Sequence, residues 1–320
     1  IAPLAEKRKP MSFCSLFRRR SNRGKFSRSW RRSVETSLRL EPMEERHLLA
    51  VTPMMVADVE VGAGSSSASQ FVEVGTTTFF VADDAIRGME LWKTDGTKSG
   101  TVLVKDIYPG GHSSSPNHLT NVDGVLYFTA DDGEHGVELW KSDGTAVGTV
   151  LVKDLDTGTT HDWWLGDLPN SSDPQNLTVV GGTLFFTASD GENGVELWKS
   201  DGTAAGTVLV KDIRPGSTYD PSTDEDVPNS SQPANLTNVN GTLFFTADDG
   251  DSGVELWMSD GTASGTRMVQ DINPGADSSS PSNLTHVGGT LYFAADDGTH
   301  GVELWRTNGT ESGTLMVKDI

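Results

Sequence analysis

The sequence of 320 residues contains a single cysteine, Cys14. One cysteine excludes an intrachain disulfide and any metal site built from several thiolates. No stretch approaches the roughly 20 consecutive apolar residues that a membrane-spanning helix needs, so we expect no transmembrane span. The sequence also lacks a Gly-x-Ser-x-Gly motif, a His-Glu-x-x-His motif and a phosphate-binding loop. The most easily recognised hydrolases, metalloproteases and nucleotide-binding enzymes are therefore not indicated.

Basic side chains are scarce beyond residue 50. Residues 1–50 hold 13 Lys and Arg against 5 Asp and Glu, whereas the rest of the chain holds 12 basic and 40 acidic side chains. A basic arm thus precedes a strongly acidic body. Phosphate backbones are bound by Lys and Arg, so this balance argues against a nucleic-acid partner. An acidic surface suits solubility and the binding of cations.

The N-terminal arm, residues 1–57, is predicted to be a disordered or targeting segment, and residues 58–70 a Gly- and Ser-rich linker. Residues 40–49, LEPMEERHLL, resemble the LEPR-x-LL type of N-terminal segment found on large secreted or surface proteins of planctomycete-like bacteria. Met43 stands where that family usually has Arg. The resemblance implies export. The other interpretation is a basic tail followed by a chance apolar stretch.

One pattern, Glu-Leu-Trp-x-x-Asp/Asn-Gly-Thr, occurs five times and organises the rest of the chain. Its glutamates and tryptophans are Glu90, Trp92, Glu138, Trp140, Glu196, Trp198, Glu255, Trp257, Glu303 and Trp305. The tryptophans lie 48, 58, 59 and 48 residues apart, which gives a period of 48 with two insertions. The repeats cover about 71–110, 117–158, 176–216, 235–275 and 283–320.

The third repeat shows the strand pattern best. Residues 176–180, 183–188, 195–200 and 207–213 are predicted strands, separated by Gly-rich turns such as Gly181-Gly182. Four antiparallel strands in about 48 residues are typical of one propeller blade. The sequence therefore predicts an all-β fold, a β-propeller-like array of five four-stranded antiparallel blades, in residues 71–320. A linear β-solenoid is the second choice. Five blades could close a small ring or form part of a larger one.

The repeat resembles the ELWxxDGT repeat family of bacterial surface and secreted proteins, across residues 71–320. Asn308 replaces the Asp in the fifth repeat, and Ala85 replaces a Gly in the first. The resemblance implies an extracytoplasmic repeat protein, and it implies no defined biochemical activity.

Acidic loops follow the second strand of each repeat. Their residues include Asp131, Asp132, Asp190, Asp248, Asp249, Asp296 and Asp297. Several carboxylates beside a Gly suit Ca²⁺, although no complete calcium-loop pattern is present. Asp-Gly pairs are also favoured simply as hairpin turns. Calcium binding and a purely structural turn both remain open.

The two insertions, roughly residues 161–171 and 218–230, are the other candidate sites. The first carries His161, Asp162, Trp163 and Trp164, and an exposed pair of indole rings suits a sugar or a protein partner. Alternatively, the loop folds over the disc and a tryptophan plugs its centre. The second insertion, acidic and interrupted by proline, is predicted to be a solvated loop.

The repeated Glu and Trp are predicted to be structural, because catalysis needs one special site rather than five equal ones. A partly buried carboxylate needs a partner, and the fourth-strand lysines are one possibility. We thus expect a non-catalytic extracytoplasmic domain, outside the cell or at its surface, for binding, adhesion or surface assembly, with calcium as a possible aid. A hydrolase or lyase on the acidic face and a purely structural spacer are the alternatives.

Overall fold

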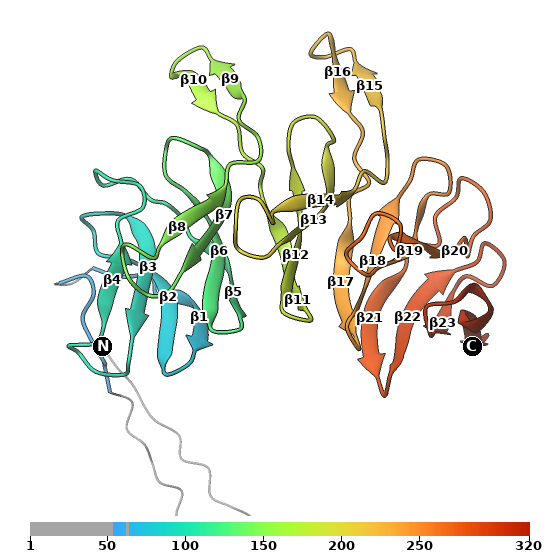
Figure 1. The fold of residues 1–320 in the computed structure, drawn as a ribbon, viewed down its shortest axis with the longest axis horizontal. Helices are drawn as coiled ribbons and strands as arrows, with labels where there is room; N and C mark the ends of the chain where they lie inside the picture. The colour runs from blue at the N-terminus through green and yellow to red at the C-terminus, as the bar shows by residue number, and fades with distance from the viewer. Residues whose placement is uncertain (1–53, 62–63) are drawn as a thin grey trace, which may run out of the picture. The chain divides into compact units, whose positions relative to one another are not determined.

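In the computed structural model, which describes residues 54–61 and 64–320, each repeat folds as one four-stranded antiparallel sheet with its strands paired in chain order (Figure 1). Units one and two consist of β1 (Ser69–Val74), β2 (Thr77–Asp83), β3 (Met89–Thr94), β4 (Val102–Lys105), β5 (Asn117–Val122), β6 (Val125–Asp131), β7 (Val137–Ser142) and β8 (Val150–Lys153). Unit three consists of β11 (Gln175–Val180), β12 (Thr183–Ser189), β13 (Val195–Ser200) and β14 (Val208–Lys211).

Units four and five repeat the plan. They consist of β17 (Ala234–Val239), β18 (Thr242–Asp248), β19 (Val254–Ser259), β20 (Arg267–Gln270), β21 (Ser282–Val287), β22 (Thr290–Asp296), β23 (Val302–Thr307), the 3-10 turn η1 (Glu311–Gly313) and β24 (Leu315–Lys318). The predicted all-β, antiparallel, four-stranded plan is confirmed. The arm predicted for residues 1–57 lies outside the described residues, apart from residues 54–57.

Two details of the sheets differ from the sequence prediction. The fourth strand of unit three ends at Lys211, not at Ile213, because the Ile213 amide donates to the Glu196 carboxylate instead of to a neighbouring strand. The first strand carries a bulge, and Asn176 within it has a positive φ of 56°. Asn tolerates this left-handed conformation better than most residues.

The hydrophobic core lies between consecutive sheets. Its best example joins unit two, through Leu139, Val152 and Leu155, to unit three, through Phe186 and Trp198. Equivalent clusters join the other neighbouring units. Because each interior sheet packs on both sides, its second strand is buried at nearly every position.

The two ends of the array differ. At the first unit, Val59 packs against Phe80 and Trp92, and the Ser66 carbonyl accepts a hydrogen bond from the Asp83 amide at 2.9 Å. Residues 58–70 were predicted to be a linker, but part of this segment belongs to the fold. At the last unit, Leu304 is 40 % exposed, whereas the equivalent Leu256 of unit four is fully buried.

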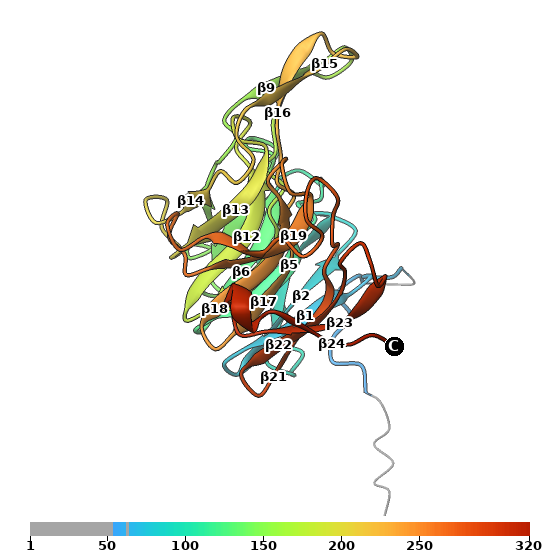
Figure 2. The ribbon, with the colours of Figure 1, turned by 90° about the vertical axis from the view of Figure 1, so that its right-hand side faces the viewer.

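Both insertions fold as two-stranded hairpins between units. The first is β9 (Thr159–Asp162) with β10 (Gly166–Pro169), and the second is β15 (Ser217–Asp220) with β16 (Glu225–Pro228). The two hairpins extend from the same end of the sheets in both views (Figures 1 and 2). The sequence placed the insertions correctly but did not predict their strands.

Candidate functional site

The loop between the second and third strands of each unit lies beside the connection to the next unit. The Met89 amide donates to the Ser113 hydroxyl, and the Val137 amide donates to the Ser171 hydroxyl. The acidic loops and the inserted hairpins therefore occur on one side of the sheets. We call this side the loop face.

The most exposed apolar group of the loop face is the tip of the first hairpin. Trp163 and Trp164 are 89 % and 93 % exposed, and Leu165 is 74 % exposed. These residues form the three-residue loop between paired Asp162 and Gly166. The tryptophans project into solvent, so the alternative that one of them plugs the centre of the disc is wrong.

The hairpin tip is held in shape by its neighbours. The Asp162 carboxylate accepts hydrogen bonds from the amides of Trp164 and Leu165, at 2.7 and 2.8 Å. Gly166 closes the loop with a φ of 88°, a conformation that favours glycine. His161 bonds to Asp167 through Nδ1 and meets the edge of the Trp163 ring, with centroids 5.6 Å apart. The four predicted residues thus form one structured group rather than a loose loop.

The second hairpin has the same kind of base and a different tip. Its loop holds no tryptophan, and Asp220 accepts hydrogen bonds from the Ser222 amide and hydroxyl. Tyr219, 55 % exposed, donates its hydroxyl to Asp224. Polar side chains that already bond to one another in solvent fit the predicted solvated segment.

The acidic loops use their carboxylates to build turns. Asp131 accepts from the Gly133 amide, and Asp132 accepts from the amides of Glu134 and His135. Asp190, Asp248, Asp249, Asp296 and Asp297 repeat this arrangement in the later units. Within residues 54–61 and 64–320, no cluster of three or more His, Cys, Asp or Glu side chains is arranged to hold a metal ion. The turn role is therefore visible in every unit, and calcium binding stays a prediction.

Histidine occurs beside an Asp in two of these loops. Burial alone would raise the pKa of Asp132, but hydrogen bonds from Glu134 and His135 outweigh it and hold that pKa below its usual value. The hydrogen bond from His300 lowers the pKa of Asp297 to about 2. Asn193 and Ser252 make the same side-chain bond in units three and four, where no histidine is present. The position tolerates different donors, which is typical of a structural turn.

The repeated glutamates are fully buried in units one to four. Glu196 accepts hydrogen bonds from the amides of Ile213 and Ser231 and from the Ser231 hydroxyl. Burial raises the pKa of Glu138 to about 7, and its hydrogen bonds from Ser172 and Leu155 offset only part of that rise. Each buried carboxylate fastens the connection that leads to the next unit.

The fourth-strand lysines are not the partners of these glutamates. Lys105, Lys153 and Lys211 each donate to a threonine carbonyl of the following unit, at 2.9 to 3.1 Å. Their ammonium groups also lie over the tryptophan ring of that unit, 5.3 to 5.9 Å from its centre. The lysines, which the sequence offered as one possible partner, therefore bond elsewhere, because the neighbouring unit supplies acceptors that one repeat alone does not reveal.

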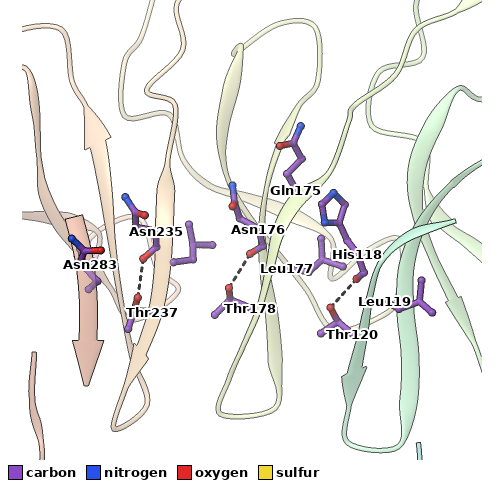
Figure 3. A pocket seen from close by; sticks show the side chains of 12 residues that line it. His118, Leu119, Thr120, Gln175, Asn176, Leu177, Thr178, Asn235, Thr237 and Asn283 are labelled. Atoms are coloured by element: carbon purple, nitrogen blue, oxygen red, sulfur yellow. Dashed lines mark hydrogen bonds between the residues drawn. The ribbon is translucent and has the colours of Figure 1, made fainter. Parts of the chain in front are cut away.

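A polar hollow of about 580 Å³ runs along the first strands of units two to five (Figure 3). Its repeated members are Asn176, Asn235 and Asn283, with His118 in the equivalent place of unit two. The Thr178 and Thr237 hydroxyls donate to the Asn176 and Asn235 carbonyls. The sequence analysis missed this lining, although the recurring Asn-Leu-Thr is a signal for it. The hollow marks where the first strands of successive units come together.

No protein-family model matches the chain, and no curated protein matches it. Among solved structures it is similar to a puromycin hydrolase, at 16% identity and a TM-score of 0.38, over 81% of this chain and 40% of that one. It is also similar to a gluconolactonase of Xanthomonas campestris, at 17% identity and a TM-score of 0.32, over 71% of this chain and 67% of that one.

A third similar structure is an α-L-arabinofuranosidase of Clostridium thermocellum, at 16% identity and a TM-score of 0.31, over 82% of this chain and 98% of that one. The chain spans about 40% of the length of the puromycin hydrolase that it matches. Likenesses this distant say nothing about activity. In the part of the chain that the structure describes, no helix has the length and apolar character to span a bilayer.

Proposed function

We propose that the repeat domain is a non-catalytic binding module that works outside the cell or at its surface, in adhesion or surface assembly. Its main contact is the tip of the first hairpin. The observation that supports this function is the exposure of Trp163 and Trp164, 89 % and 93 %, on a tip whose backbone amides bond to Asp162. Large, preordered aromatic side chains in solvent supply contact area at a low entropic cost.

We infer that the five sheets serve as blades of a β-propeller-type scaffold for this tip. The first strands of consecutive units lie side by side, β1 with β5, β5 with β11, β11 with β17 and β17 with β21. The side-chain amide of Asn238 also donates to the backbone carbonyl of Val179 in the preceding unit. Export of the domain is part of the proposal and is supported by the resemblance of residues 40–49 and of the repeat to segments of secreted proteins.

The partner in this proposal is a protein or a carbohydrate at a surface. The test compares the full chain with the double variant W163S/W164S for retention on chitin, on cellulose and on bacterial cell envelopes. Tyr219→Ser, in the second hairpin, is the matched control. We expect the double variant to lose retention on one of these materials and the control to keep it. Equal retention of all three proteins on every material would remove the hairpin tip from the proposal.

We propose a calcium role at the acidic loops as an aid to this binding. Each of these Asp residues holds turn amides with one carboxylate oxygen, as Asp131 does with Gly133, so calcium would use the second oxygens and, in loops such as that of Asp132, would displace the side chain that bonds there. A thermal melt of the full chain in millimolar Ca²⁺, then in chelator, tests this role. A rise in the melting temperature that chelator reverses and Mg²⁺ does not reproduce supports it. An unchanged melting temperature would leave the loops as turns only.

A further inference from the structure

The first strand of every unit holds one residue in the left-handed conformation, at the bulge where its register with the second strand shifts. Glycine adopts this conformation without strain, and the chain uses it at other such positions, for example Gly144 and Gly202. At the bulges all five units keep a polar side chain instead. These residues, with φ between 53° and 57°, are Gln70, His118, Asn176, Asn235 and Asn283.

The bulge itself does not depend on a bond from that side chain. In unit three the Thr178 hydroxyl donates to the backbone carbonyl of Asn176, and the Asn176 side chain donates to the Thr187 hydroxyl at 3.2 Å. In unit five the residue equivalent to Thr187 is Ala294, which has no hydroxyl, yet the bulge at Asn283 keeps a φ of 57°. Left-handed residues with side chains cluster at ligand sites, so the bulges indicate one.

Four of these side chains line the polar hollow of about 580 Å³ that runs along the first strands. Figure 3 shows Asn176, Asn235 and Asn283 in a row across neighbouring strands, with Gln175 and His118 beside them. Most of the lining comes from units two, three and four, each of which has a described unit on both sides. The volume lies within the range of about 300–1,000 Å³ that is typical of small-molecule sites.

Two smaller hollows continue this polar surface toward the loop face. One, of about 470 Å³, shares Gln175 and Asn176 with the first hollow and adds Asp173 and Gln232. The other, of about 250 Å³, shares Gln175 and His118 with it. Gln175 therefore lines all three hollows, and the combined surface suits an extended ligand better than a compact one.

The chemistry of the lining favours a neutral ligand rich in hydroxyl groups. None of the residues that line the three hollows is Lys or Arg, so an anionic ligand finds no such counter-charge there. A carboxamide offers an N–H donor and a C=O acceptor side by side, and neighbouring hydroxyls of a sugar ring present the matching acceptor and donor. Leu177 and Leu236 supply apolar surface for the C–H groups of such a ring.

An extended peptide carries similar polar groups in its backbone. It is recognised through pockets that take alternate side chains, in addition to bonds to its main chain. The row of equal amides offers one kind of contact several times over, which matches a ligand whose units are themselves alike. The lining therefore favours a sugar chain over a peptide.

We propose that this row of amides binds a short neutral oligosaccharide, at a site separate from the hairpin tip. Asn176, Asn235 and Asn283 are equivalent contacts for successive sugar rings. Gln175 and His118, which have no identical counterparts in the other units, fix the position of the chain along the row. The site goes beyond the proposed function, because it needs neither the two tryptophans nor export of the protein.

Isothermal titration calorimetry of the full chain with three neutral hexasaccharides, from cellulose, amylose and N-acetylated chitin, tests the proposal. The variant N176G/N235G removes two amides, and glycine accepts the φ of 56° at both positions, so the sheets should fold. Asn240→Gly is the matched control, because Asn240 has a φ of 52° in the turn between β17 and β18 and lines none of the three hollows. Circular dichroism verifies the fold of each variant.

Two further variants sharpen the experiment. Gln175→Ala removes an exposed side chain that lines all three hollows and makes no hydrogen bond of its own in the part of the chain that the structure describes. W163S/W164S removes the hairpin tip, so any sugar that this chain still binds is bound elsewhere. A failure of the proposed function is thereby distinguished from a failure of the amide site.

We expect the wild-type chain, Asn240→Gly and W163S/W164S all to bind at least one of the hexasaccharides. N176G/N235G should bind it at least about tenfold more weakly, as for two lost hydrogen bonds, and Gln175→Ala should also weaken binding. The proposal is overturned if W163S/W164S binds none of the three sugars, or if N176G/N235G binds them as tightly as the wild-type chain. A capped hexapeptide of serine and glycine that binds in their place would likewise overturn it.

Discussion

The repeated sheets have similar residues at equivalent positions, whereas the two inserted hairpins have different residues at their tips. In the sheets, equivalent positions carry the same chemistry, so Trp140, Trp198 and Trp257 are all about 5 % exposed and share one surrounding. In the hairpins, the bases are equivalent but the tips are not. Thr160 and Thr218 each donate to an asparagine, Asn170 and Asn229, at 2.7 Å, whereas one tip carries two tryptophans and the other an acidic turn.

This difference distinguishes the residues that stabilise the fold from those that are available to bind a partner. A side chain that recurs in every unit is constrained by its neighbours and contributes to the interface between units. A side chain that occurs once, in solvent, contributes little to folding and is available for a partner. The predictions that follow test this separation, from the largest expected change in stability to the smallest.

The largest loss should come from Trp198→Ala. Trp198 is 5 % exposed, packs between units two and three, and donates its indole N–H to the Ala188 carbonyl. Removing a buried aromatic ring should lower the free energy of unfolding by about 3–5 kcal/mol. Chemical denaturation followed by circular dichroism measures this change. Trp198→Phe should lose much less, and equal losses in both variants would show that ring burial is not what stabilises the interface.

A second effect depends on pH and on Glu138. Its folded-state pKa of about 7 exceeds the usual value of 4.5, so the folded state holds its proton more tightly than the unfolded state. The free energy of unfolding should therefore fall as pH rises from 4.5 to about 7, by about 3 kcal/mol for this group. Glu90, Glu196 and Glu255, whose pKa values burial also raises, should act in the same direction.

Glu138→Gln should make the free energy of unfolding fall less steeply with rising pH, because an amide does not ionise. Denaturation measured at several pH values between 4.5 and 8 gives the slope for each protein. Glu134→Gln, an exposed change in the adjacent loop, should leave the slope as it is in the wild-type chain. An unchanged slope in Glu138→Gln would show that this carboxylate does not bind the proton.

The sequence alone predicted most of the fold, because the same pattern of four strands recurs in all five repeats. It also predicted a structural role for Glu196 and Trp198, since five equal copies do not make one active site; both side chains are buried, and the role itself stays a prediction. It did not identify the partners of Glu196, because Ser231 lies 35 residues away across an insertion. The strands of the two hairpins were missed as well, since each occurs once and is only four residues long.

The smallest change in stability should come from W163S/W164S, the variant that we expect to lose partner binding. Both rings are about nine-tenths exposed, so neither contributes to the core. The loop amides that Asp162 holds belong to the backbone, and the substitutions leave them in place. The free energy of unfolding should stay within about 0.5 kcal/mol of the wild-type value, as for ordinary surface substitutions.

The same denaturation experiment as for Trp198→Ala measures this value. The variant Asp162→Ala sharpens the comparison, because it keeps both indole rings and removes the carboxylate that orients them. It should also leave global stability nearly unchanged, while weakening partner retention through a less ordered tip. A large loss of stability in W163S/W164S would mean that the tip packs against the sheets in solution. Trp163 and Trp164 would then contribute to stability as well as to recognition, which would contradict the distinction between the repeated core and the hairpin tip.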